Sequence, residues 1–261
     1  MQIGFLILMF ILGACMGSFL CCQVRRLHLK EKKQKFGPRS ICLHCKKQLK
    51  WYENIPIISW LALGGKCSKC KAKIGAAEII SELLIAIAFL CIGTTVDVIS
   101  ATAQNWVVFT VTILLTVSLS FLAIYDGIYG ELPNFALILS VVLAVAVFIA
   151  KNWFSITWPV VLDALFAVAI LGGIYLLLYL ISKGKWVGDG DWILGAIIGL
   201  ALGSPWLALI TLFVSNITAC FVMYPAVKSK KNKQIFFGPF LVFAFIVAIT
   251  FSGFLESMII Y

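Results

Sequence analysis

Four of the nine cysteines form two short pairs in a basic part of the chain. Cys42 and Cys45 enclose two residues, as do Cys67 and Cys70, and 21 residues separate the pairs. This spacing is typical of a zinc ribbon, because each tight turn supplies two thiolates to one tetrahedral Zn²⁺. Redox dithiols and disulfides are the alternatives, and His44 could replace one cysteine as a ligand. We expect a closed, structural four-cysteine zinc site that stabilises a small domain.

Two aspartates, Asp126 and Asp191, are the best candidates for acid–base chemistry among eleven acidic residues. We expect Asp126 in a short loop over 126–134, directly after one apolar segment, and Asp191 in a second loop, directly before another segment. Two carboxylates at close range share one proton, so one can polarise a peptide carbonyl while the other activates water. The alternatives are that Asp191 is a helix N-cap and that Asp126 is a loop residue. We expect both to be catalytic in peptide hydrolysis.

A glycine-rich loop carries the second aspartate in the pattern Gly188-Asp189-Gly190-Asp191. The two glycines predict a strained turn and a close approach of the backbone to an extended peptide. Asp189 adds a carboxylate beside Asp191. We assign the catalytic position to Asp191, with Gly188, Asp189 and Gly190 as supporting residues of the loop.

Other acidic residues have plainer interpretations. Glu53 and Glu31 lie among lysines, and we expect them to be solvated partners of these cations. Glu78 and Glu82 are one turn apart at the start of an apolar segment. Glu78 is favourably placed near a helix N-terminus. Glu82 lies deeper, where an acid usually has a partner or a function.

The composition predicts a membrane protein. Of the 261 residues, 62% are hydrophobic and 12% are charged, whereas soluble domains have about 45–50% and about 25%. The mean hydropathy is +1.05. So few charges cannot cover the surface of a soluble protein, and lipid must therefore be the main solvent. The first apolar segment has basic residues after it, not before it, and we therefore expect a retained helix and not a signal peptide.

Eight apolar segments approach the about 20 residues that cross a bilayer as a helix. The first seven cover approximately residues 3–22, 76–96, 106–125, 135–150, 158–182, 192–203 and 206–227, and the eighth covers 236–254. Ser204-Pro205 separates the sixth from the seventh, although these two could form one kinked helix. We therefore expect an all-α polytopic membrane protein with a small cytoplasmic zinc-ribbon-like insert after its first helix.

The basic residues predict the orientation. Fourteen of the 21 Lys and Arg residues lie between Arg25 and Lys73, and basic loops stay in the cytoplasm. With eight spans, 20 of the 21 then lie on the cytoplasmic side and only Lys151 lies outside. Asp126 and Asp191 then share the cytoplasmic face. We interpret the basic patch as a determinant of membrane topology, and we expect no nucleic-acid partner.

We divide the chain into a first transmembrane helix over 1–22, a cytoplasmic zinc-binding insert with the four paired cysteines over 23–75, and a membrane catalytic domain over 76–261. No internal repeat is evident in the sequence. The remaining cysteines lie in the predicted helices, where they are expected to pack as small apolar residues.

Over nearly its whole length the chain closely resembles the type IV prepilin peptidases, bacterial inner-membrane leader peptidases. Seven elements carry the resemblance in the same order. They are Gly17-Ser18-Phe19-Leu20 with Arg25-Arg26-Leu27, the paired cysteine turns, Glu53–Leu61, Glu82-Leu83-Leu84, Asp126 with Leu132-Pro133-Asn134, Gly188–Asp191, and Phe237–Leu241. The resemblance identifies Asp126 and Asp191 with the family's two catalytic aspartates.

The resemblance implies removal of the short, basic leader from type IV prepilins or pseudopilins at the cytoplasmic face of the inner membrane. It implies a cut after a glycine and usually before a phenylalanine. It also implies N-methylation of the new terminus with S-adenosylmethionine, since the cysteine-bearing insert accompanies bifunctional members. No glycine-rich nucleotide-binding fold is evident, and the methyl-donor site stays unassigned.

Three positions depart from the family's pattern: Ile193 replaces a common lysine, Cys21 replaces an asparagine and Leu43 replaces a proline.

The alternative functions are a peptidase without methyltransferase activity, a non-catalytic pilus-assembly scaffold, and a transporter or channel. A transporter would use Asp126, Asp163 and Asp191 as an ion relay distributed across the membrane depth. The two best candidates instead share one face, which favours chemistry there.

Overall fold

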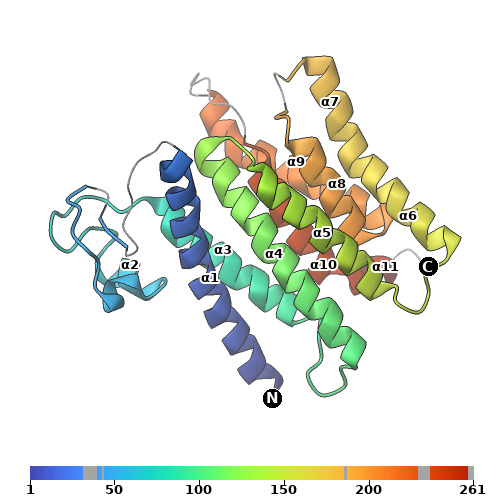
Figure 1. The fold of residues 1–261 in the computed structure, drawn as a ribbon, viewed down its shortest axis with the longest axis horizontal. Helices are drawn as coiled ribbons and strands as arrows, with labels where there is room; N and C mark the ends of the chain where they lie inside the picture. Colours follow the sequence, from blue (N-terminus) through green and yellow to red (C-terminus); the bar gives the residue numbers. More distant parts are fainter. Residues whose placement is uncertain (32–39, 43, 185–186, 229–235, 258–261) are drawn as a thin grey trace. The chain divides into compact units, whose positions relative to one another are not determined.

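The computed structural model describes residues 1–31, 40–42, 44–184, 187–228 and 236–257. This part of the chain is helical, with only two isolated β-bridges, both in the insert (Figure 1). It divides into two compact units, Met1–Gly93 and Thr94–Tyr261. The prediction of an all-α polytopic protein is confirmed.

The first unit is a pair of packed helices with the insert between them in sequence. The helices are α1 (Gln2–Glu31) and α3 (Ala76–Gly93), and the insert contains the short helices η1 (Trp51–Asn54) and α2 (Ile58–Ala62). We expected the first helix to end near Cys22. It continues to Glu31 because the polar residues that follow favour helix and include no glycine or proline.

Two glycines one turn apart bring α1 against α3. A Cβ atom on Gly13 would lie 2.7 Å from Cα of Ala86, and one on Gly17 would lie 2.7 Å from Cα of Glu82. Small residues four apart allow membrane helices to approach at backbone distance. This contact fixes the depth of Glu82 relative to α1.

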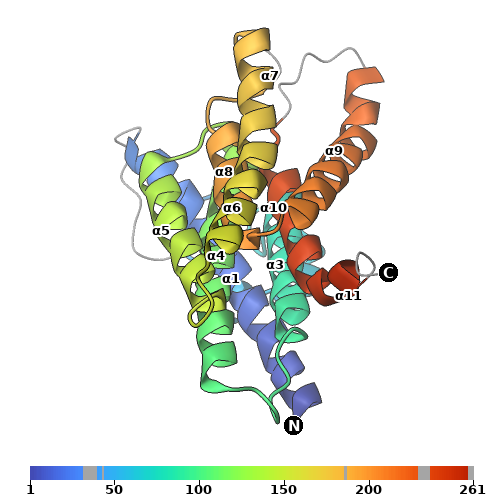
Figure 2. The same ribbon diagram turned by 90° about the vertical axis from the view of Figure 1, so that its right-hand side faces the viewer.

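The second unit is a bundle of long and short helices, which Figure 2 shows from a second side. Its elements are α4 (Ala103–Tyr129), α5 (Asn134–Lys151), α6 (Trp158–Val168), η2 (Ala169–Gly173), α7 (Ile174–Ser182), α8 (Asp191–Leu202), α9 (Pro205–Lys228), α10 (Gly238–Thr250) and α11 (Ser252–Ser257). α6, the π-helical turn η2 and α7 form one continuous helix of 25 residues. α5 and α10 each pack against both α4 and α8.

The sixth and seventh apolar segments are separate helices. α8 ends at Leu202 because Gly203 adopts the left-handed conformation, with φ of 70°. Pro205 then begins α9, where its missing N–H would in any case have no helical partner. The predicted break at Ser204-Pro205 is confirmed.

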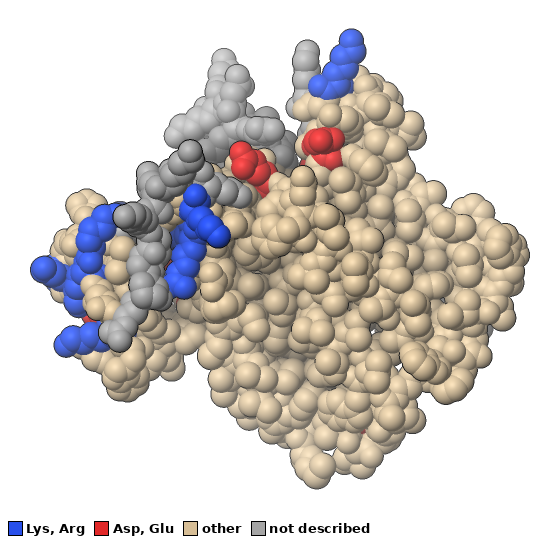
Figure 3. Space-filling view, in the orientation of Figure 1, with Lys and Arg blue, Asp and Glu red and all other residues tan. Residues whose placement is uncertain are grey.

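Six helices in the described part of the chain are long and apolar enough to cross a membrane: α1, α3, α4, α5, the continuous helix 158–182, and α9. α8 and α10 have 12 and 13 residues, or lengths of about 18 and 20 Å, which are shorter than the about 30 Å hydrocarbon core. All eight predicted segments are thus helical, and two are short. Figure 3 shows uncharged surface over most of the helices of the second unit, with acidic side chains at one end.

Candidate functional site

The four paired cysteines converge in the first unit. Their Sγ atoms all lie within 4.8 Å of one another, and the Cys42–Cys70 and Cys45–Cys67 pairs are each 3.9 Å apart. A tetrahedral Zn²⁺ with Zn–S bonds of about 2.3 Å places its sulfurs about 3.8 Å apart. The donor set therefore fits a metal ion and is far from disulfide distance. The predicted four-cysteine cluster is confirmed, whereas His44 is exposed and outside it.

The two cysteine turns repeat one backbone design at an offset of 25 residues. The amide of Lys46 donates to Cys42 O at 2.9 Å, and that of Lys71 donates to Cys67 O at 3.0 Å. Both lysines are left-handed, with φ of 55° and 57°. Antiparallel bridges flank the turns at Ile41–Gln48 and Lys66–Lys73. The sequence repeat is short, since the two turns share the Cys-x-x-Cys-Lys pattern of Cys42–Lys46 and Cys67–Lys71, and the repeat extends further in the backbone.

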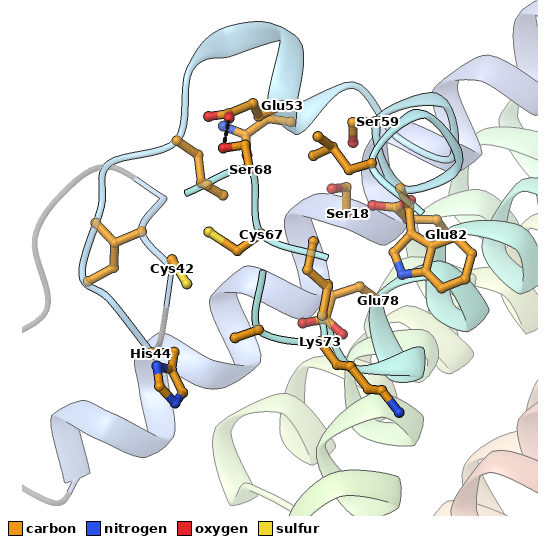
Figure 4. A pocket seen from close by; sticks show the side chains of 18 of the residues that line it. Ser18, Cys42, His44, Glu53, Ser59, Cys67, Ser68, Lys73, Glu78 and Glu82 are labelled. Atoms are coloured by element: carbon orange, nitrogen blue, oxygen red, sulfur yellow. Dashed lines mark hydrogen bonds between the residues drawn. The ribbon is translucent and has the colours of Figure 1, made fainter. Parts of the chain in front are cut away.

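Glu53 joins the two cysteine turns. It is 8% exposed and accepts hydrogen bonds from Lys47 Nζ at 2.8 Å, Lys50 N at 2.8 Å and Ser68 Oγ at 2.5 Å (Figure 4). Lys47 follows the first turn and Ser68 lies within the second. The Lys47 ammonium, then the Lys50 amide and the Ser68 hydroxyl lower the pKa of Glu53 from 4.5 to about 2. We expected a solvated residue; Glu53 pairs with a lysine but is buried.

Replacing Glu53 should destabilise the insert in a pH-dependent way. The folded pKa near 2 lies below the ordinary value of 4.5. The carboxylate's contribution is therefore complete above about pH 4.5 and is lost as the pH falls towards 2. Glu53→Gln should lower the unfolding temperature by a constant amount from about pH 7 to pH 5 and by less below about pH 4.5.

Thermal unfolding of both proteins, followed by tryptophan fluorescence, measures this difference. Acid release of a bound metal affects wild type and variant alike, so the difference between them isolates Glu53. A gap in unfolding temperature that stays the same at every pH would contradict the assignment.

The two candidate catalytic aspartates belong to helix ends, and the end of α4 and the start of α8 lie at the same end of the second unit (Figure 1). Asp126 is in the last turn of α4 and 6% exposed, and Asp191 is the first residue of α8 and 4% exposed. α4 ends shortly after Asp126 because Gly130 is left-handed, and its amide donates to Asp126 O at 2.8 Å. We expected Asp126 in a loop; the helix instead holds its backbone rigidly.

Each aspartate accepts one backbone hydrogen bond. The amide of Gly238, at the start of α10, donates to Asp126 Oδ2 at 2.9 Å, and the amide of Gly188 donates to Asp191 Oδ2 at 2.9 Å. Both carboxylates line one cavity of about 350 Å³. The structure therefore brings together two acids that are 65 residues apart in sequence, with α5 and α10 bridging their helices.

The glycines of the second loop serve close packing and not a strained turn. A Cβ atom on Gly190 would overlap the side chain of Leu132, and one on Gly188 would lie 3.2 Å from Asp191 Oδ2. Neither glycine has a positive φ, and that of Gly190 is −88°. The loop before α8 therefore presses on the loop after α4, which is how both aspartates reach one cavity.

Comparison with known proteins assigns the sequence to a family. The model of the bacterial peptidase A24 N-terminal domain matches residues 11–96. A prepilin leader peptidase/N-methyltransferase of Aeromonas hydrophila is 31% identical over 211 residues, covering 79% of this chain and 69% of the relative. This chain belongs to the prepilin leader peptidase/N-methyltransferase family. A relative of the same name from Stutzerimonas stutzeri is 28% identical, and the match covers 95% of this chain and 91% of that relative's length.

Another prepilin leader peptidase/N-methyltransferase, from Myxococcus xanthus, is 41% identical over 85 residues. These residues make up 33% of this chain and 25% of that relative. No solved structure matches the chain. Leu132 and Asn134 line the aspartate cavity together with Asp126 and Asp191, and Gly238 of the Phe237–Leu241 segment donates to Asp126.

Ile193, at the position where the resemblance led us to expect a lysine, lines the aspartate cavity. The cavity is also lined by four acidic residues, Asp126, Glu131, Asp189 and Asp191. No lysine or arginine is among the described residues that line this cavity. In this family member the cavity wall is therefore acidic and apolar, and the aspartates have no basic neighbour from that position.

Gly238 belongs to the aspartate site, although the acidic residues of the sequence alone do not point to it. It donates to Asp126, and a Cβ atom at this position would lie 2.7 Å from Asp126 Oδ2. Gly238→Ala should therefore displace the carboxylate and lower the rate of peptide cleavage at least about 10-fold, since small misplacements of catalytic groups have large effects. Gly253→Ala is the matched control, because nothing lies within 4 Å of its added Cβ.

Cleavage rates of the two alanine variants on one prepilin substrate test this prediction. Equal rates for Gly238→Ala and Gly253→Ala would show that the position of the Asp126 carboxylate does not depend on Gly238.

A buried polar network supports the same corner of the bundle. Tyr175 is 1% exposed, and its hydroxyl lies 3.2 Å from Ser215 Oγ and accepts from Asn216 Nδ2 at 3.2 Å. Its ring packs on that of Phe237, with centroids 5.1 Å apart. Phe237 immediately precedes Gly238, so the network holds the segment of chain that reaches Asp126. Polar residues in apolar helices were the available sequence signal.

Proposed function

We propose that this chain is a membrane aspartic endopeptidase that removes the leader of type IV prepilins or pseudopilins. The observation that carries the proposal is that Asp126 and Asp191, both buried, line one cavity. Relatives named prepilin leader peptidase/N-methyltransferase supply the substrate class. A transporter is less well supported, because the two acids lie at one end of their helices and not along a path.

The proposed mechanism assigns the reaction to the aspartate pair. Two carboxyl groups in one buried cavity hold one proton between them, because two negative charges there repel each other. The protonated carboxyl polarises the scissile carbonyl, and the ionised one takes a proton from the attacking water. The leaving amine then receives a proton from the pair. The Gly238 and Gly188 amides hold one oxygen of each carboxylate in place.

The four-cysteine cluster would hold a structural Zn²⁺ through Cys42, Cys45, Cys67 and Cys70. Four thiolates complete the coordination of zinc, so the ion has no open position for chemistry. Its role would be to fix the insert, which is too small to have a large core of its own. The charge distribution supports a multi-pass inner-membrane protein with the insert and the aspartate loops in the cytoplasm.

A second activity, N-methylation of the new amino terminus with S-adenosylmethionine, is proposed from the names of the relatives. One experiment tests both activities. Purified protein in detergent should remove the leader from a prepilin, and with S-adenosylmethionine the product should gain about 14 Da for one methyl group. Leader loss without this gain would leave the peptidase proposal intact and contradict the methyltransferase. Intact prepilin would contradict the peptidase.

A further inference from the structure

An uncharged segment interrupts the basic insert. Residues 40–75 contain seven lysines and one acid, Glu53, which gives a formal charge of +6. Residues 51–65 contain none of these lysines, and Glu53 is buried. Lys50 and Lys66 flank this segment, and Figure 3 shows basic side chains over the insert. The insert therefore combines cationic cysteine turns with a segment that has no exposed charge.

Within this segment, α2 turns an apolar face outwards. Its inward residues Ser59 and Trp60 line a cavity of about 400 Å³ in the first unit (Figure 4). Ile58 and Leu61, three residues apart on the opposite face, are each 64% exposed. The preceding helix η1 exposes Trp51 to 79%. Soluble domains rarely group large apolar side chains on their surface, so this face needs a partner.

The attachment of α2 to α3 fixes the depth of this face. The amide of Ile57, immediately before α2, donates to Glu82 Oε2 at 2.7 Å. α3 has 18 residues, a length of about 27 Å, so almost all of it is needed to cross the about 30 Å hydrocarbon core. Glu82 is the seventh of these residues, about 9 Å from the start of the helix. α2 is therefore attached within the span of α3 and not above it.

Neighbouring residues agree with this depth. Arg25 Nη2 binds Glu78 Oε1 at 2.6 Å, one turn closer to the start of α3, and a long arginine side chain suits the headgroup level. Leu83 and Leu84 directly follow Glu82 and are exposed, so α3 presents apolar side chains to lipid at the level of the attachment. Figure 1 likewise shows α2 alongside α1 and not beyond its end.

We propose that the outward face of α2, formed by Ile58 and Leu61, inserts into the lipid leaflet on the side of the insert. This is the cytoplasmic leaflet in the proposed topology. Membrane-surface helices bury an apolar face about 5–10 Å into the boundary between headgroups and acyl chains. Trp51 and Tyr52 suit this boundary, where these residue types are enriched. The lysines of the cysteine turns would lie among the headgroups and attract anionic lipids.

A second copy of the chain and a peptide are the competing partners for this face. Lipid is favoured because the face lies at the same depth as the exposed apolar side chains of α3, which is itself a candidate membrane span. The positive charge of the insert also complements anionic headgroups. The inference is independent of both proposed activities, since it concerns how the insert is held at the membrane.

Photo-crosslinking of the full-length protein in vesicles with equal amounts of phosphatidylcholine and phosphatidylglycerol tests the proposal. One variant carries the benzophenone amino acid p-benzoylphenylalanine at the position of Leu61. The matched control carries it at Lys69, an exposed residue of the second cysteine turn. Benzophenone reacts with nearby C–H bonds, so acyl chains beside it form adducts that mass spectrometry detects. The yield of lipid adducts at position 61 should be at least about 5-fold that at position 69, because acyl chains reach only an inserted face.

The metal content of each variant shows whether the insert is folded, and if the change at Leu61 fails this check, the label at Ile58 replaces it. Equal yields of lipid adducts on α2 and at Lys69 would overturn the proposal. So would crosslinks from α2 to a second copy of the chain, seen as a covalent dimer, or to a prepilin added to the vesicles. Either product would make the face a protein-docking surface.

Discussion

Asp126→Asn and Asp191→Asn should each lower the rate of leader removal by about 10²–10⁴-fold, the usual contribution of a general acid or base. Asparagine has almost the same shape as aspartate and can still accept the Gly238 or Gly188 hydrogen bond. It cannot take a proton from water or share one with its partner. Each substitution therefore removes the proton chemistry and leaves the packing of α4, α8 and α10 in place.

Asp163→Asn is the matched control, because Asp163 is exposed and lies outside the aspartate cavity. It should cleave prepilin at the wild-type rate. Initial rates on one substrate, with unfolding temperatures as the folding check, make the comparison. The double variant should be little slower than either single one, because the two carboxyls act as a unit. Substantial cleavage in both single variants would exclude the aspartate mechanism.

Much of this arrangement could be predicted from the sequence. The lengths of the apolar segments predict the helices, because a chain in lipid must satisfy its backbone hydrogen bonds within itself. The prolines and glycines between these segments predict where the helices end. The cysteine spacing predicts the metal cluster, since a short turn delivers two ligands whatever surrounds it. The positions of Asp126 and Asp191 at helix ends predict a shared face, although helix ends alone did not show that Asp126 lies inside α4.

The remaining features depend on contacts between distant segments. Gly238 reaches Asp126 across 112 residues, and no local pattern specifies that approach. Gly13 and Gly17 form a small-residue pair whose partner helix is known only from packing. Glu53 is buried because Lys47 and Ser68, from different turns, close around it. In each case the sequence contains the residue type, but the fold supplies the partner that gives the residue its role.

Loss of a single metal ligand should abolish metal binding and unfold the insert. Wild type should contain about one Zn²⁺ per chain, and Cys42→Ser or Cys67→Ser should contain almost none, because a serine oxygen is a poor substitute for a thiolate. The apparent binding free energy of structural zinc, about 10–16 kcal/mol in small domains, is folding free energy. The insert has little else to replace it, since its two turns are joined mainly by the cysteines and the Glu53 contacts.

Cys15→Ser and Cys220→Ser are the matched controls, because both cysteines are exposed and outside the cluster. They should keep the metal and their unfolding temperature. Metal analysis and limited proteolysis at the insert measure the effect, and a full metal content in Cys42→Ser would rule out the four-cysteine site. Asp126→Asn changes a residue outside the cluster and should keep the full metal content of wild type.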